Sequence, residues 1–189
     1  MIGTSRTHQE SKPEVIDLSD QIDLDFITLT YKVMSANVEN YRITTDSNIL
    51  DDDSKEFPWS DIGFSLHILI QPLAERIFNK KLTPTYQLFR IYNPGAKLRQ
   101  HRDRAPCEYS ASLSILGKPW AFEFEEKSII TEPGKIVFYR GDWLHGRETP
   151  APDYQGQLFL HWIDSNGRFL DVSYDRGEYN KRVYTNVTL

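Results

Sequence analysis

The chain has 189 residues, 39% of them hydrophobic and 13% aromatic, which is enough apolar material for one domain of ordinary size but too little for two. Its 22 basic and 27 acidic residues leave a net charge of -5, which argues against a protein that coats nucleic acid. The single cysteine, Cys107, cannot form an internal disulfide, and the N-terminus has no signal-peptide pattern, so we expect a cytoplasmic protein. No apolar stretch reaches the roughly 20 residues that span a bilayer, so we expect no membrane segment.

The N-terminal part of the chain carries few regular patterns. Residues 1–13 are polar and predict a flexible tail. Between Ile22 and Asn40 the pattern is mixed and predicts no particular element. The aspartate-rich stretch from Thr44 to Ser54 predicts a solvated loop, because the order of ligands that indicates an EF-hand calcium site is absent from it.

An amphipathic helix is predicted before the middle of the chain. Apolar residues recur there at helical spacing, with Ser60 and Asp61 as candidate N-terminal caps and Pro72 as a candidate kink. These apolar residues are Leu66, Leu69, Ile70, Leu73 and Ile77. We therefore expect residues 14–84 to form a helical support that packs against the rest of the domain.

After Pro84 the pattern changes to short segments rich in aromatic and β-branched residues, which predict β-strands. The predicted strands are Tyr86 to Tyr92, Lys97 to His101, Tyr109 to Leu116, Trp120 to Phe124, Lys127 to Ile130, Lys135 to Tyr139, Gln157 to Trp162 and Phe169 to Val172. Short strands behind a helical front indicate a mainly β protein with supporting helices (α+β), built on a double-stranded β-helix, or jelly roll. We expect one domain over residues 14–189, with its jelly-roll core over residues 85–175.

Two histidines and an aspartate have the spacing of a metal site. His101 and Asp103 stand two apart, so on an extended segment both side chains project to the same side and can hold one cation. If the strand that contains His145 lies opposite the first in a jelly roll, the three residues present two imidazoles and one carboxylate to a metal. This donor set, with positions left open, is typical of non-haem Fe(II) oxygenases.

The surroundings of these three residues resemble the 2-oxoglutarate and Fe(II)-dependent dioxygenase superfamily, in particular its prolyl-4-hydroxylase-like branch. The resemblance covers residues 85–165 approximately and follows the order of motifs in that family. The segments that carry it are Arg90–Asp103, Ser110–Gly117, Glu132–Asp142 and His145–Glu148.

By this resemblance, His101, Asp103 and His145 would be the iron ligands and form the catalytic centre. The cofactors implied are Fe(II), 2-oxoglutarate and O2, with ascorbate as a candidate reductant. Halogenating relatives replace the carboxylate ligand with a small residue, whereas this chain keeps Asp103, which favours hydroxylation. The reaction implied couples O2 activation to the decarboxylation of 2-oxoglutarate to succinate.

The resemblance also implies how the co-substrate is held. Tyr92 matches a family tyrosine that contacts the distal carboxylate of 2-oxoglutarate. Many relatives add an arginine or lysine nine to twelve residues after the second histidine, but residues 154–157 contain no base. A diacid needs a cation at its far end, so we expect another basic residue to take the place of the missing one. Arg147, on the same side of an extended segment as His145, is the first candidate, and Arg90, in phase with Tyr92, is the second.

Other residues near these motifs have structural interpretations. His161, in an apolar strand, is expected to be a hydrogen-bonded core residue or a support for the metal ligands. Cys107 is expected to pack in the core or to line the pocket. Arg102 and Arg104 should point away from the metal by strand alternation, either into solvent or to the mouth of the site, where they would favour an acidic or phosphate-bearing substrate.

The sequence therefore predicts a hydroxylase of an amino-acid residue or a small molecule, whose partner is a small-molecule, peptide or protein substrate. The alternatives are a jelly-roll binding module that has lost co-substrate turnover, an AlkB-like nucleic-acid demethylase and a zinc hydrolase. The AlkB branch typically has an Arg-x-Asn-x-Thr-x-Arg run after the distal histidine, and residues 146–165 lack it, which argues against nucleic acid as the substrate. Neither the particular substrate nor the oligomeric state follows from the sequence.

Overall fold

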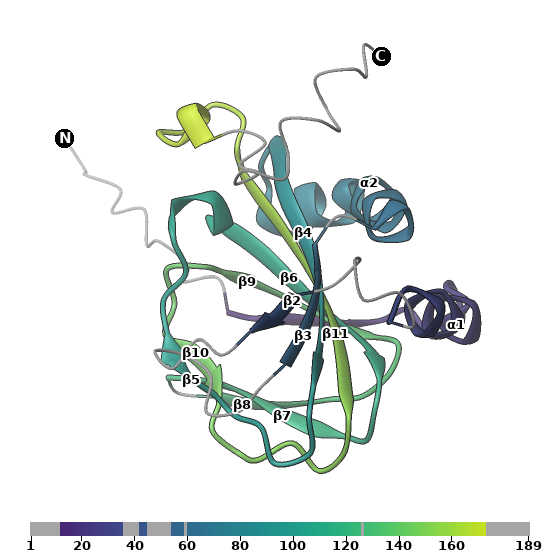
Figure 1. Ribbon diagram of the computed structural model, residues 1–189. Coiled ribbons are helices and arrows are strands. Elements are labelled where there is room, and N and C mark those ends of the chain that lie inside the picture. Colours follow the sequence, from purple (N-terminus) through teal and green to yellow (C-terminus); the bar gives the residue numbers. More distant parts are fainter. Residues whose placement is uncertain (1–11, 36–41, 45–53, 59, 126, 173–189) are drawn as a thin grey trace, which may run out of the picture.

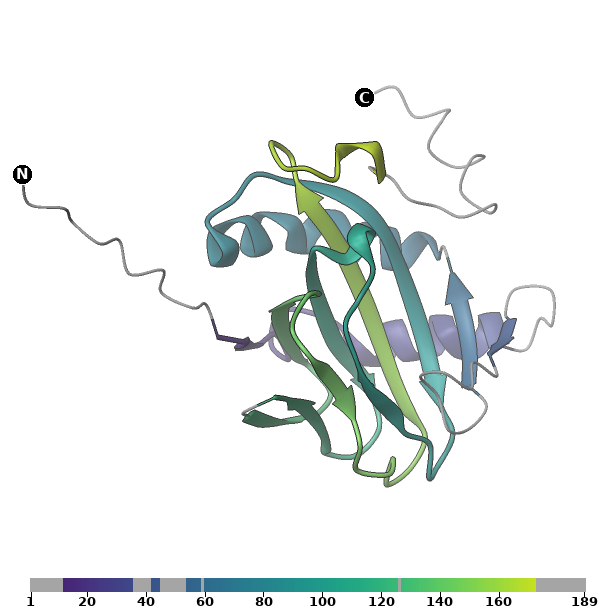
Figure 2. The same ribbon diagram turned by 90° about the vertical axis from the view of Figure 1, so that its left-hand side faces the viewer.

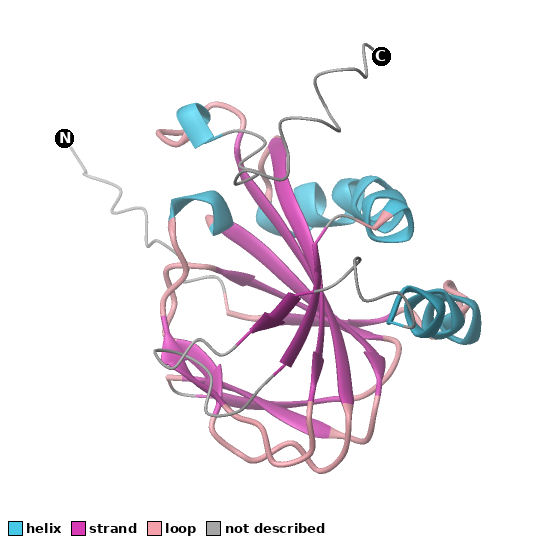
Figure 3. Ribbon diagram, in the orientation of Figure 1, coloured by secondary structure: helices cyan, strands magenta, loops and turns pink. Residues whose placement is uncertain are grey.

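The computed structural model describes residues 12–35, 42–44, 54–58, 60–125 and 127–172. The tail expected over residues 1–13 and the loop expected from Thr44 to Ser54 lie mostly outside these ranges. Within them, two antiparallel sheets face each other and two helices pack on the outside of the larger sheet (Figure 1, Figure 3). Neither of these helices is long and apolar enough to cross a membrane.

The two sheets contain all the strands of the described residues. The larger sheet has the order β1-β9-β6-β11-β4-β3-β2 and the smaller sheet the order β5-β10-β7-β8. The strands are β1 (Glu14–Asp17), β2 (Arg42–Thr44), β3 (Ser54–Pro58), β4 (Leu82–Tyr92), β5 (Leu98–His101), β6 (Tyr109–Leu116), β7 (Trp120–Phe124), β8 (Lys127–Thr131), β9 (Lys135–Arg140), β10 (His145–Arg147) and β11 (Gln155–Asp164). Neighbouring strands pair antiparallel in both sheets. This architecture confirms the predicted double-stranded β-helix.

Helices α1 (Leu24–Ser35) and α2 (Asp61–Phe78) cover the outer face of the larger sheet (Figure 1). The α2 helix is the one predicted from the apolar spacing. Its N-cap is Ser60, whose hydroxyl accepts a hydrogen bond of 3.0 Å from a main-chain amide of the first turn. The side chains of α2 in the core beneath the helices include Leu66, Ile70 and Ala74.

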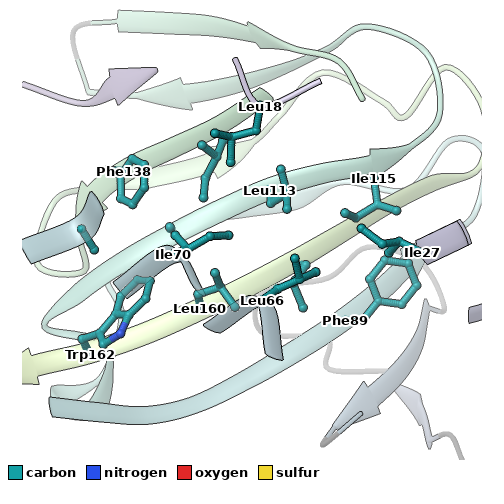
Figure 4. Packing of buried hydrophobic residues seen from close by; sticks show 14 of the residues in the cluster. Leu18, Ile27, Leu66, Ile70, Phe89, Leu113, Ile115, Phe138, Leu160 and Trp162 are labelled. Carbon is teal, nitrogen blue, oxygen red and sulfur yellow. The ribbon is translucent and has the colours of Figure 1, made fainter. Parts of the chain in front are cut away.

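The strand β11 lies between β4 and β6, and all of its residues are buried. Figure 2 shows β4 and β11 side by side along their length, with the helices behind them. Alternate side chains of a strand point to opposite faces. Leu160 and Trp162 join the core beneath the helices (Figure 4), whereas Phe159 and His161 line a cavity between the sheets. One strand therefore builds part of the core with one face and part of the cavity with the other.

The structure differs from the sequence expectations in three segments. Phe169 to Val172, expected as a strand, contains the 3-10 helix η3 (Leu170–Val172), so that prediction is wrong; aromatic and β-branched residues form a strand only where a neighbouring strand pairs with them. The mixed pattern between Ile22 and Asn40 contains α1. Residues 14–84 contribute β1, β2 and β3 to the larger sheet in addition to the helices, and such short strands are too brief to show an alternating pattern.

Leu160 is 0% exposed in the core between the larger sheet and the helices. We expect Leu160→Ala to lower the free energy of unfolding by about 2–5 kcal/mol, because the substitution removes buried methyl groups and leaves a cavity. Leu69→Ala is the matched control: its side chain is 67% exposed on α2, and its effect should stay below about 0.5 kcal/mol. Urea denaturation followed by circular dichroism measures both, and equal effects would contradict this description of the core.

Candidate active site

The ends of two neighbouring strands bring His101, Asp103 and His145 together. His101 is the last residue of β5, His145 is the first of β10, and the two are paired directly across these strands. Asp103 follows β5, and its amide donates to the Gly141 carbonyl oxygen at 2.7 Å. One ligand atom from each of the three side chains lies within 4.8 Å of the others. The structure thus brings the three predicted metal ligands into one cluster.

Both histidines are oriented so that Nε2 faces the aspartate. Nδ1 of His101 lies 2.8 Å from the Arg99 carbonyl oxygen. Nδ1 of His145 lies 2.8 Å from the Trp143 carbonyl oxygen. Because a carbonyl oxygen only accepts, each Nδ1 carries the proton, which leaves the Nε2 lone pair for a metal. The two Nε2 atoms lie 3.5 and 3.7 Å from the carboxylate oxygens of Asp103.

The pKa shifts of Asp103 and His145 suit a divalent cation, whereas the raised pKa of His101 means that a metal competes there with a proton. Burial raises the pKa of Asp103, but its interactions with His101 and His145 outweigh burial and the net shift is downward. Burial lowers the pKa of His145. Burial also acts to lower the pKa of His101, whereas the contact with Asp103 and a backbone carbonyl raise it overall. Two imidazoles beside an anionic carboxylate form a donor set that fits Fe(II) and several other divalent metals.

Gly146 allows β10 to lie close to β5. A side chain at this position would place its Cβ 2.6 Å from the Leu98 carbonyl oxygen and 2.9 Å from the main chain of Arg99. These contacts are with backbone atoms, which cannot move aside without separating the strands. The imidazole ring centroids of His101 and His145 lie 4.5 Å apart across this pair of strands. The glycine between His145 and Arg147 is therefore required for the pairing that holds the two imidazoles together.

A cavity of about 360 Å³ opens beside the three residues, between the two sheets. Its volume is at the lower end of the range for small-molecule sites. Aromatic rings form much of its wall, and sequence reasoning missed their role because an aromatic residue on a strand is equally typical of a core. These rings belong to Tyr86, Phe122, Tyr139 and Phe159. The other lining residues are Leu88, Arg90, Leu98, His101, Arg102, Asp103, Arg104, Cys107, His145 and His161.

Cys107 and His161 form a second group with Asp103, whose ligand atoms also lie within 4.8 Å of one another. Cys107 is 2% exposed, and its sulfur lies 3.1 Å from the Tyr86 hydroxyl oxygen. Nδ1 of His161 lies 2.9 Å from the Ser110 hydroxyl oxygen. The two groups share Asp103, so they are not independent sites. Of the two groups, only that of His101, Asp103 and His145 has its imidazoles oriented by backbone carbonyls.

Arg90 lines the cavity from β4 and forms an ion pair with Glu56 of β3. Its Nη1 lies 3.4 Å from the hydroxyl oxygen of Tyr92. Burial acts to lower the pKa of Arg90, but Tyr92 and Glu56 raise it overall, so the guanidinium stays charged. Sequence reasoning missed Glu56, and no local signal marks it, because only the pairing of β3 with β4 brings it to Arg90.

Arg147 is 0% exposed and does not line the cavity. Its guanidinium carbon lies 4.4 Å from the ring centroid of Trp120 and 4.6 Å from that of Phe122. Nη1 donates to the Ala121 carbonyl oxygen at 3.0 Å, and Nη2 donates to the Gln157 amide oxygen at 3.3 Å. Burial lowers the pKa of Arg147 to about 10, which still leaves it charged at neutral pH. Within the described residues, no carboxylate forms an ion pair with this buried cation.

The two arginines approach Gln157 from different sheets. Arg90 is the residue paired with Gln157 in the register of β4 and β11. Arg147 reaches Gln157 from β10, in the smaller sheet. Gln157 is 0% exposed and lies in the window where the resemblance leads one to expect a base. A guanidinium from a strand of the smaller sheet is thus hydrogen-bonded to the residue at that position.

No protein-family profile matches the sequence, and no curated protein matches it. Solved structures share its fold. A prolyl-4-hydroxylase from Pseudomonas putida aligns with a TM-score of 0.61 and 15% identity, over 84% of this chain and 95% of its own. A prolyl hydroxylase from Trichoplax adhaerens, solved with a peptide fragment of the hypoxia inducible factor oxygen degradation domain, aligns with a TM-score of 0.62 and 12% identity, over 82% of this chain and 84% of its own.

A third similar structure is that of an enzyme with a different reaction. The non-haem α-ketoglutarate-dependent epimerase SnoN from nogalamycin biosynthesis aligns with a TM-score of 0.65 and 10% identity, over 80% of this chain and 77% of its own. The chain therefore has the fold of 2-oxoglutarate and Fe(II)-dependent oxygenases, including prolyl hydroxylases. Because the neighbours include both hydroxylases and an epimerase, the fold alone does not specify the reaction.

Burial lowers the pKa of His161 from its ordinary value of 6.5 to about 4. Between these values the unfolded chain binds a proton that the folded protein does not, so acid favours unfolding. We expect the free energy of unfolding of the metal-free protein to fall as the pH is lowered through this window, and to fall less steeply in His161→Gln. Urea denaturation at a series of pH values measures both slopes. Identical slopes would show that His161 is not held neutral by the fold.

Proposed function

We propose that this protein is an Fe(II)/2-oxoglutarate-dependent oxygenase that hydroxylates an amino-acid residue or a small molecule. The observation that carries the proposal is the pair of imidazoles whose Nδ1 atoms are held by backbone carbonyls and whose Nε2 atoms face Asp103. Two imidazoles and one carboxylate beside a cavity are the ligand set of non-haem Fe(II) oxygenases. The fold shared with solved oxygenases supports the same class.

The buried cations support 2-oxoglutarate as the co-substrate. A buried guanidinium without a carboxylate partner is unfavourable until an anion approaches it, and Arg147 has this environment. Arg90 lines the cavity and contacts Tyr92, although Glu56 already balances its charge. In this proposal the distal carboxylate binds at Arg90, which lines the cavity, whereas Arg147 and Tyr92, which are fully buried and do not line it, reach the carboxylate only when lining side chains move.

The residues of this chain have distinct roles in the proposed reaction. When bound, the metal and 2-oxoglutarate would supply the oxidation, in which O2 activation is coupled to decarboxylation to succinate and hydroxylation of a C–H bond. His101, Asp103 and His145 would hold the metal. The rings of Phe122 and Phe159 form apolar wall that excludes water from the reacting atoms. Ascorbate as a reductant stays a prediction.

The size of the cavity limits the substrate. A volume of about 360 Å³ admits one small molecule or one amino-acid side chain beside the metal ligands. The Trichoplax prolyl hydroxylase was solved with a peptide fragment, which supports a peptide residue as one of the two substrate classes proposed here.

Anaerobic addition of Fe(II) and then 2-oxoglutarate to the purified protein, followed by visible absorption, tests the proposal. We expect a charge-transfer band that appears only when both are present, because the keto acid must chelate the metal. His145→Ala should abolish the band, since one metal ligand is lost. Arg147→Met should raise the 2-oxoglutarate concentration at half-maximal absorbance by about 10-fold or more, which corresponds to one charge-assisted hydrogen bond.

Two further variants make this titration decisive. Arg76→Gln, at an exposed position of α2, is the matched control and should leave the band unchanged. Arg90→Met separates the two arginines: if it weakens co-substrate binding while Arg147→Met does not, Arg90 alone is the anchor. Iron binding without a band at any 2-oxoglutarate concentration would contradict the oxygenase proposal and favour the jelly-roll binding module.

A further inference from the structure

Cys107 and His161 are two potential metal ligands that the proposed iron site of His101, Asp103 and His145 does not use. Each offers a ligand atom within 4.8 Å of a carboxylate oxygen of Asp103 and of the other. All three residues of this second group line the cavity, although Cys107 and His161 are only 2% and 5% exposed. A metal ion that enters the cavity can therefore reach the second group as well as the proposed iron site.

The turn at Gly141 brings Asp103 and Cys107 together. Cys107 ends the 3-10 helix η2 (Ala105–Cys107), which begins two residues after Asp103. A side chain at Gly141 would place its Cβ against the Cys107 carbonyl oxygen and 3.0 Å from the Cβ of Asp103. The Gly141 carbonyl oxygen also accepts a hydrogen bond from the Asp103 amide at 2.7 Å. One residue without a side chain thus allows the backbones of both ligands to pack on the same turn.

Two hydroxyl groups connect η2 to β11, the strand that carries His161. The Thr85 hydroxyl oxygen lies 2.6 Å from the Pro106 carbonyl oxygen and 3.0 Å from that of His161. The Ser110 hydroxyl donates to the Cys107 carbonyl oxygen at 3.2 Å, and its oxygen lies 2.9 Å from Nδ1 of His161. Because Ser110 donates its own proton, it accepts from Nδ1–H, which leaves the Nε2 lone pair of His161 for a metal.

The surroundings of Cys107 suit a thiolate ligand. The hydroxyl oxygen of Tyr86 lies 3.1 Å from the sulfur. A tyrosine hydroxyl is protonated at neutral pH, so it can donate a hydrogen bond to the sulfur once the thiol has lost its proton. A divalent metal that binds the sulfur displaces the thiol proton to solvent. The hydroxyl would then stabilise the thiolate that the metal requires.

The two groups of ligands favour different metals. Two imidazoles and a carboxylate suit Fe(II), whereas a thiolate in place of one imidazole favours Zn(II). The ligand atoms of one tetrahedral zinc ion lie about 3.5 Å apart, so shifts of about 1 Å by the side chains close the second group around an ion. The donor set of Asp103, Cys107 and His161 is therefore that of a zinc site with one position open to water.

Asp103 belongs to both groups, which prevents them from filling together. It is the only carboxylate among the described residues that line the cavity. Two divalent cations at this carboxylate would have only one further anion of the protein beside them, the Cys107 thiolate. Repulsion between two cations so close together is costly in a partly buried site. A single ion is therefore expected, in one group or in the other.

We propose that Asp103, Cys107 and His161 form a second metal site, for Zn(II) or an equally thiophilic divalent cation, which competes with the proposed iron site for Asp103. An ion bound there takes the carboxylate from the iron ligands, so Zn(II) at the second site and Fe(II) at the first exclude each other. This inference goes beyond the proposed function, because it depends on the ligand groups and not on the reaction.

Ultraviolet difference absorption during a Cd(II) titration of the metal-free protein tests the second site. Cd(II) has the charge and the filled d shell of Zn(II), and its bond to a thiolate gives a charge-transfer band. Because Cys107 is the only cysteine, the band identifies the ligand. We expect the band to form, to disappear when Zn(II) is added, and to persist when Mg(II), which prefers oxygen ligands, is added. A titration without the band overturns the site.

Three variants connect the band to these residues. Cys107→Ser should abolish it. His161→Gln should raise the Cd(II) concentration at half-maximal absorbance by about 10-fold or more, since even residues that only orient a metal ligand change affinity by this much. His145→Ala is the matched control and should keep the band, because His145 belongs to the other site. Unchanged Cd(II) affinity in His161→Gln, or loss of the band in folded His145→Ala, overturns the second site.

Circular dichroism reports whether each variant is folded. If Cys107→Ser is not, cadmium NMR of the unmodified protein replaces it, because sulfur ligation moves the cadmium resonance far from its position with nitrogen and oxygen ligands alone. A resonance without sulfur ligation overturns the site.

Fe(II), added anaerobically and without 2-oxoglutarate, tests the competition. At about ten times its dissociation constant, Fe(II) should raise the half-maximal Cd(II) concentration about 10-fold by mass action. It should have no such effect in His145→Ala, which lacks one iron ligand. An unmoved Cd(II) midpoint in the unmodified protein, or an equal shift in His145→Ala, overturns the competition. A chain that binds no Fe(II) overturns the competition and the oxygenase function, whereas the cadmium band still reports the second site.

Discussion

The register of β11 is the constraint on which the rest of the structure depends. The strand is buried on both faces, with Leu160 toward the helices and His161 toward the cavity. A slip of one residue would exchange the two faces. Gln157 and His161 would then enter an apolar core without hydrogen-bond partners, at a cost that apolar burial elsewhere could not offset. Pairing with β4 on one side and β6 on the other therefore determines the core and the position of the site together.

The sequence was sufficient to predict those features that are signalled by nearby residues. Strand alternation places His101 and Asp103 on one side of a segment, and short aromatic segments separated by turns predict the jelly roll. Contacts between distant segments have no such signal. Glu56 meets Arg90 across 34 residues of sequence, and the helical spacing of the buried Ile27 and Tyr31 in α1 is obscured by apolar residues on its exposed face. Arg102 and Arg104 beside Asp103 are exposed and line the cavity, which agrees with the expected position at the mouth of the site.

The two buried arginines between the sheets have different surroundings. Arg90 has a carboxylate partner in Glu56 and a raised pKa. Arg147 has only neutral acceptors and two aromatic faces, and its pKa is lowered. A charge whose hydrogen-bond acceptors are all neutral gains from an incoming anion, because Glu123 raises the pKa of Arg147 only in part and burial still lowers it overall. The fold therefore contains one cation that is already stabilised and one whose environment favours ligand binding.

The close approach at Gly146 also constrains how the chain can diverge. Any side chain between His145 and Arg147 would collide with the backbone of β5, so a glycine is expected at this position wherever this arrangement of strands is kept. A search for distant relatives that requires a base on the strand after the second histidine would miss such chains. Pairing His-x-Asp with a downstream His-Gly-Arg, and accepting glutamine at the position of Gln157, defines a pattern by which they can be recognised.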